Sequence, residues 1–156
     1  MLTMKEAAAQ FLENKRIAVT GVSRTAKDHG ANTVFKRLRD RGYEVFAVNP
    51  NADQVEGAHS YHDLKSIPGV VDAVVIATAP DNAEGTMREC DELGIKQVWM
   101  HRGPGAGSVS VPATDYGREH GITVIDGGCP LMFEPTADFG HKVMRVMFRS
   151  HVPKTV

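Results

Sequence analysis

The segment IAVTGVSR, residues 17–24, joins a short apolar run to a glycine turn. Three of the four residues before Gly21 are β-branched, as is usual at the first strand-to-helix turn of a dinucleotide-binding fold. The fingerprint of such folds has further glycines two and five residues after the first, where this chain has Ser23 and Ala26. The turn is therefore a damaged NAD site, a turn without a ligand, or a phosphate site for another molecule.

Short apolar runs alternate with segments of helical spacing along the rest of the chain. The runs are IAVTG (17–21), EVFAV (44–48), DAVVIAT (72–78), QVWM (97–100) and ITVI (122–125). Runs that are apolar on both faces are typical of parallel strands covered by helices on both sides. Helical patterns over residues 31–38, 83–90 and 111–120 lie between them. This order predicts an α/β fold of the Rossmann-like, doubly wound type, with a mainly parallel sheet of five to six strands and helices on both faces.

The length and the terminal patterns favour one domain over residues 1–156. At the N-terminus, Thr3 and Glu6 have the spacing of a capping box and predict a short helix over residues 3–13. At the C-terminus, apolar residues at 139, 143, 146 and 147 predict a helical extension over about residues 136–150. The apolar stripe of this extension either covers the sheet or joins a subunit interface, in which case the protein is a homodimer.

Charge, hydropathy and cysteine content argue against several classes of partner. The formal net charge is −1, which disfavours nucleic acid, and no apolar run approaches the ~20 residues that span a membrane. Cys90 and Cys129 lie far apart, and the seven histidines form neither HxH nor HExxH, so no metal site is expected. The N-terminus lacks a signal-peptide pattern. The sequence therefore predicts a cytoplasmic protein in a reducing compartment.

The loops that follow the strands are the expected ligand site, because open parallel sheets bind ligands beyond the carboxyl ends of their strands. The first loop carries Ser23, Arg24 and Lys27, which can donate to or pair with phosphate. The second strand ends in Val48-Asn49-Pro50 without the acid that an NAD ribose requires, and Asp53 lies beyond the proline. These features favour a phosphorylated, nucleotide-like ligand other than NAD. NADP stays open, because the two basic side chains could face a 2′-phosphate.

The order of several short motifs resembles the CoA-binding-domain family. The motifs are Val19-Thr20-Gly21-Val22-Ser23, Gly30, Gly42-Tyr43-x-Val45-x-x-Val48-Asn49-Pro50, Gly57, Ile67-Pro68-x-x-Val71-Asp72-x-Val74-Val75, Trp99-Met100-x-x-Gly103, Gly121-Ile122-x-Val124 and Cys129-Pro130. The family is of Rossmann type and is related to the nucleotide-binding domain of succinyl-CoA synthetase α-subunits. The resemblance is to its small stand-alone members and covers roughly residues 15–135.

The resemblance implies non-catalytic binding of CoA or an acyl-CoA at the carboxyl edge of the sheet. The residues it implies are Thr20, Gly21, Val22 and Ser23 for the phosphate turn, Arg24 and Lys27 for the phosphates, Val48, Asn49 and Pro50 for adenosine, Ala77, Thr78, Ala79 and Pro80 for the opposite wall, and Cys129 and Pro130 for the pantetheine arm. Many family members have a lysine after the Asn-Pro pair, where this chain has Asn51. The basic residues of the first loop must then neutralise more of the negative charge of the phosphates.

Two alternatives to simple CoA binding remain. One is an NAD(P)-dependent oxidoreductase or an NAD(P)-sensing module. The other is thiol or acyl transfer by Cys129, because a helix starting at Pro130 would lower the pKa of the preceding thiol. Free cysteines are more often small buried hydrophobic residues, so the sequence favours a protein that is not an enzyme. His101 follows a strand and is expected to be a surface loop residue.

Overall fold

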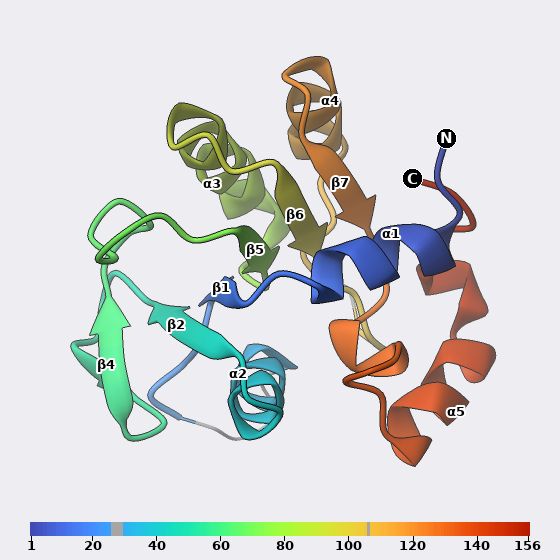
Figure 1. Ribbon diagram of the computed structural model, residues 1–156, viewed down its shortest axis with the longest axis horizontal. Coiled ribbons are helices and arrows are strands. Elements are labelled where there is room, and N and C mark those ends of the chain that lie inside the picture. The colour runs from blue at the N-terminus through green and yellow to red at the C-terminus, as the bar shows by residue number, and fades with distance from the viewer. Residues whose placement is uncertain (26–29, 106) are drawn as a thin grey trace.

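The computed structural model describes residues 1–25, 30–105 and 107–156, and Figure 1 shows their arrangement. Within these ranges, no helix is long and apolar enough to cross a membrane. Lys27, which is predicted to lie near a phosphate, falls outside the described residues.

Seven strands of the described chain form one sheet in the order β3-β4-β2-β1-β5-β6-β7. Their bounds are β1 Arg16–Thr20, β2 Glu44–Val48, β3 Gln54–Val55, β4 Ala58–Tyr61, β5 Ala73–Ile76, β6 Gln97–Met100 and β7 Thr123–Asp126. Neighbouring strands are parallel, except for the antiparallel pair β3–β4 at one edge. The prediction of a doubly wound, mainly parallel α/β fold is confirmed, with seven strands instead of the expected five to six.

The short strands β3 and β4 account for the difference in number. They have two and four residues, and neither segment is an apolar run. They form a hairpin whose two central residues, Glu56 and Gly57, have positive φ angles of 51° and 71°, as a type I′ turn requires. Glutamate is an unusual residue at the first of these positions, so the hairpin carries no recognisable sequence signal.

Five α-helices and two 3-10 helices complete the described fold. Their bounds are α1 Met4–Leu12, α2 Gly30–Asp40, α3 Pro80–Glu92, α4 Val111–Glu119, α5 Phe139–Met147, η1 Pro130–Met132 and η2 Arg149–His151. Figure 1 shows α1 and α2 on one face of the sheet and α3 and α4 on the other. The predicted N-terminal capping box is confirmed, because Thr3 and Glu6 exchange side-chain-to-backbone hydrogen bonds at the start of α1.

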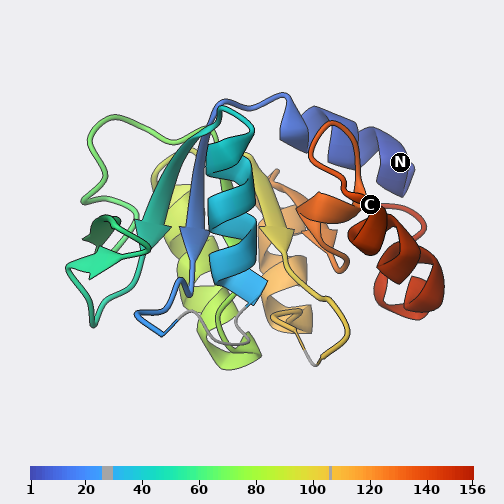
Figure 2. The same cartoon turned by 90° about the horizontal axis from the view of Figure 1, so that it is seen from below.

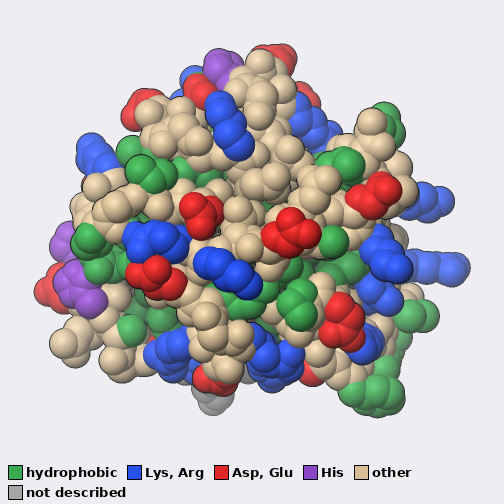
Figure 3. All heavy atoms as spheres, viewed as in Figure 1, with side chains coloured by type: hydrophobic (Ala, Val, Ile, Leu, Met, Phe, Trp, Pro, Cys, Tyr) green, Lys and Arg blue, Asp and Glu red, His purple; other side chains and the backbone are tan. Residues whose placement is uncertain are grey.

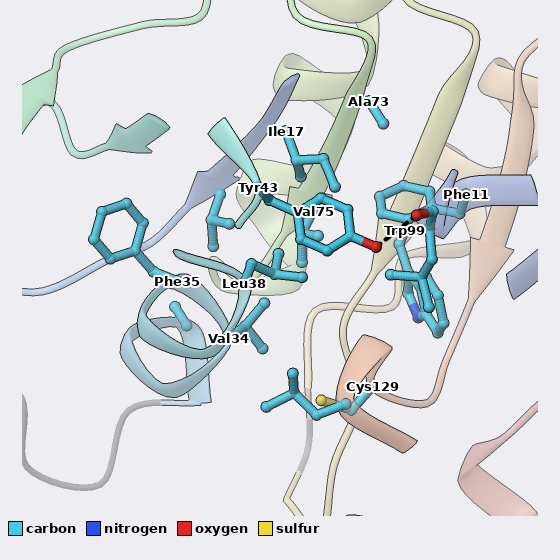
Figure 4. Close-up of a cluster of buried hydrophobic side chains, with 14 of the residues drawn as sticks. Phe11, Ile17, Val34, Phe35, Leu38, Tyr43, Ala73, Val75, Trp99 and Cys129 are labelled. Atoms are coloured by element: carbon cyan, nitrogen blue, oxygen red, sulfur yellow. Dashed lines mark hydrogen bonds between the residues drawn. The ribbon is translucent and has the colours of Figure 1, made fainter. Parts of the chain in front are cut away.

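Each face of the sheet buries its own apolar cluster, and residues of β1 alternate between the two. On the side of α1 and α2, Trp99 packs edge-on against Phe11 with 5.3 Å between ring centroids. In the same cluster, the hydroxyl of Tyr43 donates to the carbonyl oxygen of Leu12 at 2.6 Å, which ties the start of β2 to the end of α1 (Figure 4). The central strands are therefore covered on both sides, as their continuous apolar runs predict.

The C-terminal helix α5 forms as predicted, but its apolar stripe does not cover the sheet. Phe139 and Met147 are 83% and 69% exposed, and Figure 3 shows hydrophobic side chains gathered at the corner of the molecule over α5. The helix docks through its other face, where Met144 packs against the core. Its N-cap Asp138 pairs with Arg37 Nη1 at 2.5 Å. Of the two alternatives for the stripe, covering the sheet is therefore excluded for its exposed residues, and the homodimer stays a prediction.

The two ends of the chain lie side by side next to α1 (Figure 1). The N–H of Met4 donates to the carbonyl oxygen of Lys154 at 3.0 Å, and the N–H of Val156 donates to that of Leu2 at 2.9 Å. The segment that follows α5 therefore returns to the N-terminal helix and is hydrogen-bonded to its start.

The carboxyl ends of the parallel strands meet at one edge of the sheet, at the bottom of Figure 2. The first turn of α2 and the loop after β6 lie on the same side of the molecule. Ligands of doubly wound sheets bind at this edge, so the candidate site is built there.

Candidate functional site

Three adjoining pockets form a groove along the carboxyl edge. The β2 pocket of about 650 Å³ lies between the ends of β1 and β2 and α3, the central pocket of about 370 Å³ lies at the ends of β5 and β6, and the α5 pocket of about 450 Å³ lies between α2, η1 and α5. Thr78 lines both the β2 and the central pocket. Gly30, His101, Gly103 and Pro104 line both the central and the α5 pocket. The three pockets therefore adjoin one another along this edge of the sheet.

The groove brings together most of the residues predicted to bind the ligand. The β2 pocket contains Thr20, Gly21, Val48, Asn49, Pro50 and Thr78. The central pocket contains Ala77, Thr78 and Ala79, and the α5 pocket contains Cys129. The predicted residues that line none of these pockets, within the described part of the chain, are Val22, Ser23, Arg24, Pro80 and Pro130. Contact of any of these residues with a ligand stays a prediction.

Gly21 shapes the turn after β1. Its φ angle is +80°, and its N–H donates to the carbonyl oxygen of Val48 at 3.1 Å. A Cβ atom on this residue would lie 2.4 Å from the carbonyl oxygen of Ala77. Glycine is thus required both by the backbone conformation and by the close approach of the chain that follows β5.

Asn32, which was not predicted as a site residue, fixes the loop after Gly21. This 1% exposed side chain accepts from the N–H of Ser23 at 2.9 Å and donates to the carbonyl oxygen of Ser23 at 2.8 Å. It also donates to Glu56 Oε1 at 2.8 Å. The sequence signal was an amide side chain in the first turn of a helix directly after a glycine loop, from where it can reach loop backbone. The Ser23 hydroxyl accepts from the N–H of Thr25, so it also stabilises the backbone of this loop.

Asn49 couples the first loop to the second. Its side-chain Nδ2 donates to the carbonyl oxygen of Val22 at 2.9 Å, and its Oδ1 accepts from the N–H of Asn51 at 2.8 Å. The backbone N–H of Asn49 donates to the carbonyl oxygen of Tyr61, at the end of β4. This side chain therefore sets the backbone positions of both loops that border the β2 pocket.

Two threonines at the middle of the groove have different hydrogen-bonding states. The hydroxyl of Thr20 accepts from the N–H of Ala77 at 3.2 Å, which joins the ends of β1 and β5. The hydroxyl of Thr78 is buried and has no hydrogen-bond partner among the described residues. Buried hydroxyls are nearly always hydrogen-bonded in native structures, so this one is a candidate to bond a ligand when its side chain turns toward either pocket. Three other side chains of the described residues, Ser60, Gln97 and Arg102, also carry a buried polar atom without a partner, but of the four only Thr78 lines these pockets.

His101 is not the surface loop residue that the sequence predicts. It is half-buried at the boundary of the central and α5 pockets, and its ring occupies the space that Gly30 leaves free: a Cβ on Gly30 would lie 2.8 Å from Cε1 of His101. Burial of the imidazole, and secondarily the neighbouring His141, lowers the pKa of His101 to about 4. The ring is therefore neutral at pH 7.

The low pKa of His101 predicts a loss of stability in mild acid. The unfolded chain takes up this proton near the ordinary histidine pKa of 6.5, whereas the folded protein does so only near 4, so stability present above pH 6.5 is lost as the pH falls toward 4. We expect the free energy of unfolding to fall by roughly 1–2 kcal/mol between pH 7 and pH 5. Urea unfolding at both pH values measures this, and the His101→Gln variant should lose most of the dependence. An equal dependence in both proteins would contradict the assignment.

His141, on α5, faces the same pocket as His101. Its Nδ1 is 2.8 Å from Oδ1 of Asp138, and Asp138 also pairs with Arg37. Desolvation alone would raise the pKa of the Asp138 carboxyl, but hydrogen bonds from His141 and the charge of Arg37 lower it to about 2. Asp138 therefore stays ionised and fixes the ring of His141, with Nε2 as the nitrogen that can face a ligand.

The surroundings of Cys129 oppose the alternative in which a helix N-terminus activates its thiol. The residue does precede a helix, but η1 has only three residues, and the side chain is 2% exposed within the apolar cluster shown in Figure 4. Burial raises the pKa of the Cys129 thiol to about 12. Cys90, on α3, is equally buried, and its thiol pKa is likewise raised to about 12. Neither thiol is a thiolate at neutral pH.

Comparison with known families bears directly on this groove. A family model described as the CoA binding domain matches residues 15–135. The chain belongs to this CoA-binding domain family. The resemblance inferred from the sequence is thereby confirmed. The matched range ends before α5, so His141 and Met144, the two residues of α5 that line the groove, lie outside the range that the family model matches.

Individual relatives differ in how much of their length the chain covers. The uncharacterised protein YneT of Bacillus subtilis is 33% identical over 116 residues, which are 74% of this chain and 82% of that protein. The α-subunit of ADP-forming acetate–CoA ligase II of Pyrococcus furiosus is 37% identical over 89 residues, 56% of this chain but only 19% of the subunit. A hypothetical protein of Pyrococcus horikoshii has a similar structure, with a TM-score of 0.70, 26% identity, and coverage of 79% of this chain and 83% of that one.

Proposed function

We propose that the chain binds CoA or an acyl-CoA along the carboxyl-edge groove and does not transform it. The observation that carries this proposal is the position of Thr78, whose hydroxyl has no partner among the described residues and which lines two adjoining pockets, in a chain of the CoA-binding domain family. A CoA molecule is long, polar in its nucleotide half and thinner in its pantetheine arm, which suits three linked pockets better than one compact cavity. The similarity to part of a CoA ligase subunit supports the same ligand.

The residues that line each pocket suggest which part of the CoA molecule it holds. The adenosine half goes to the β2 pocket, against Val48, Asn49 and Pro50. The phosphates lie by the glycine turn at Gly21, where Arg24 can pair with them; Lys27, predicted to lie nearby, is outside the described residues. The pantetheine arm then follows the wall that residues 77–80 form and extends toward Cys129 and Pro130.

Binding without turnover is favoured over the alternatives that the sequence leaves open. Thiol or acyl transfer by Cys129 requires a thiolate, and the raised thiol pKa opposes it. An NAD site requires an acid for the ribose, and the acid after β2, Asp53, is paired with His62 Nε2 at 2.9 Å. A single domain over residues 1–156 and a reducing, cytoplasmic location are part of the same proposal, supported by the one seven-stranded sheet of the described residues and by two free cysteines.

Calorimetric titration tests the proposal, and the Thr78→Val variant locates the site. We expect CoA to bind the wild-type chain at micromolar levels or better and to bind Thr78→Val about tenfold more weakly, because one hydrogen bond to the ligand is lost. The free variant should be as stable as the wild type or slightly more so, since an unpartnered buried hydroxyl is removed.

Thr20→Val is the matched control, because the Thr20 hydroxyl is already bonded within the protein. This variant should lose about 1–2 kcal/mol of stability, the opposite of the Thr78 result. If titration of the wild type gave no detectable heat with CoA but a clear binding heat with NADPH, the proposal would be contradicted. Equal CoA affinities of the wild type and Thr78→Val would show that the Thr78 hydroxyl does not bond the ligand.

A further inference from the structure

The α5 pocket forms the end of the groove farthest from the β2 pocket. It joins the central pocket through the shared residues Gly30, His101, Gly103 and Pro104. If CoA lies as proposed above, its nucleotide half occupies the opposite end, so the sulfur and whatever it carries are directed toward the α5 pocket. The inference that follows rests on that proposed function.

The α5 pocket is larger than a thiol needs. Its volume is about 450 Å³, within the usual range of about 300–1,000 Å³ for sites that hold small organic groups. Its walls contain four apolar side chains that come from three helices, namely Val34, Leu131, Met132 and Met144. Val34, Leu131 and Met132 are 0–1% exposed, so the apolar surface left to a ligand comes from the half-buried Met144 and the exposed Pro104. A free sulfhydryl would leave that surface in contact with water, whereas a group with several carbons would cover it.

The polar side chains of the α5 pocket are suited to a carbonyl oxygen. His101 is neutral and carries one N–H, and the ring of His141 is held by Asp138 so that Nε2 can face the pocket. A carboxylate at the far end of the acyl group would have to leave water beside the apolar side chains of the pocket, which disfavours it. The pocket therefore fits an uncharged carbonyl compound with an apolar tail.

We infer that the α5 pocket is an acyl chamber, which receives the uncharged, short apolar acyl group of an acyl-CoA. The ligand that the chain prefers is then a short-chain acyl-CoA rather than free CoA. Two of the residues that line the chamber, His141 and Met144, lie on α5, outside the range that matches the family model.

A chain-length series tests the inference with the intact wild-type protein. Titrations with CoA, acetyl-CoA, butyryl-CoA and succinyl-CoA give the four dissociation constants. Each methylene moved from water into an apolar cavity tightens binding about fourfold, so butyryl-CoA should bind on the order of tenfold tighter than acetyl-CoA. Succinyl-CoA should bind more weakly than butyryl-CoA, because its distal carboxylate must be desolvated.

Two variants place the acyl group in the α5 pocket. Met144→Trp, on the inner face of α5, and Thr33→Phe, at an exposed position of α2 that lines the pocket, both fill the space. In each variant the ratio of butyryl-CoA to acetyl-CoA affinity should fall to about one. Val146→Trp is the matched control, because Val146 lies on the outer face of the same helix and is 68% exposed, so the wild-type ratio should persist. Thr33→Phe keeps the test valid if the Met144 variant does not fold.

The possible results distinguish a failure of the acyl-chamber inference from a failure of the proposed CoA binding. CoA and all acyl-CoAs binding with equal affinity would overturn the chamber and leave CoA binding intact. Tighter binding of succinyl-CoA than of butyryl-CoA, or an unchanged chain-length ratio in both filled variants, would also overturn it. Absence of binding by every thioester and by CoA would overturn both proposals.

Discussion

Gly21→Ala is expected to lower the free energy of unfolding by roughly 3–5 kcal/mol and to weaken CoA binding more than tenfold. Two costs add at this position. The φ angle of +80° is unfavourable for any residue with a Cβ atom, and that atom would lie 2.4 Å from the carbonyl oxygen of Ala77. Because the obstacle is backbone, no side-chain rotation relieves it, and the ends of β1 and β5 must move apart. That movement displaces Thr78, the residue shared by two of the pockets.

Thermal unfolding measures the stability part of this effect, with Gly42→Ala as the control. Gly42 has a similar φ angle of +87°, but a Cβ atom there would have no described neighbour within 4 Å, so the control isolates the backbone cost of about 1–2 kcal/mol. The Gly21 variant should unfold about 10 °C below the wild type, and the control only a few degrees below. Equal losses in the two variants would show that the close approach to Ala77 contributes nothing.

The strands that carry the groove could be predicted, because their signal is local. Runs such as Ala73–Ile76 are apolar on both faces, and the glycine turn after β1 marks where the first strand ends. The hairpin of β3 and β4 could not, since its left-handed Glu56 is held by contacts from α2 rather than by turn residues. Local patterns thus predicted the scaffold and the edge at which the candidate site lies.

The side chains that shape the candidate site depend on contacts between distant residues, which no local pattern contains. His101 is buried because Gly30, far from it in sequence, leaves room for its ring. Cys129 precedes a helix, as expected, but the cluster around it removes the water that a thiolate needs. For His101 the misjudged quantity was burial, whereas the burial of Cys129 agrees with the usual state of a free cysteine.

Asn32→Asp is expected to have the second large effect, a loss of roughly 3–5 kcal/mol in the free energy of unfolding. The native amide donates both to the carbonyl oxygen of Ser23 and to the carboxylate of Glu56, each at 2.8 Å. A carboxylate at this 1% exposed position has no proton to donate, so it faces one oxygen of Ser23 and a second negative charge on Glu56. The loop after Gly21 is then released, and we expect CoA affinity to fall at least tenfold with it.

A double-mutant cycle with Glu56→Gln measures how much of this loss is charge repulsion. Glu56→Gln alone should cost less than about 1 kcal/mol, because Lys36, its ion-pair partner at 3.8 Å, is 44% exposed and the glutamine oxygen can still accept from Asn32. In the double variant Asn32→Asp/Glu56→Gln, the new amide can donate to the new carboxylate, so about half of the lost stability should return. Urea unfolding of the four proteins gives the coupling energy, which should exceed about 1.5 kcal/mol. A coupling near zero would mean that Asn32 acts on Ser23 alone, and that the hairpin does not help to hold the phosphate turn.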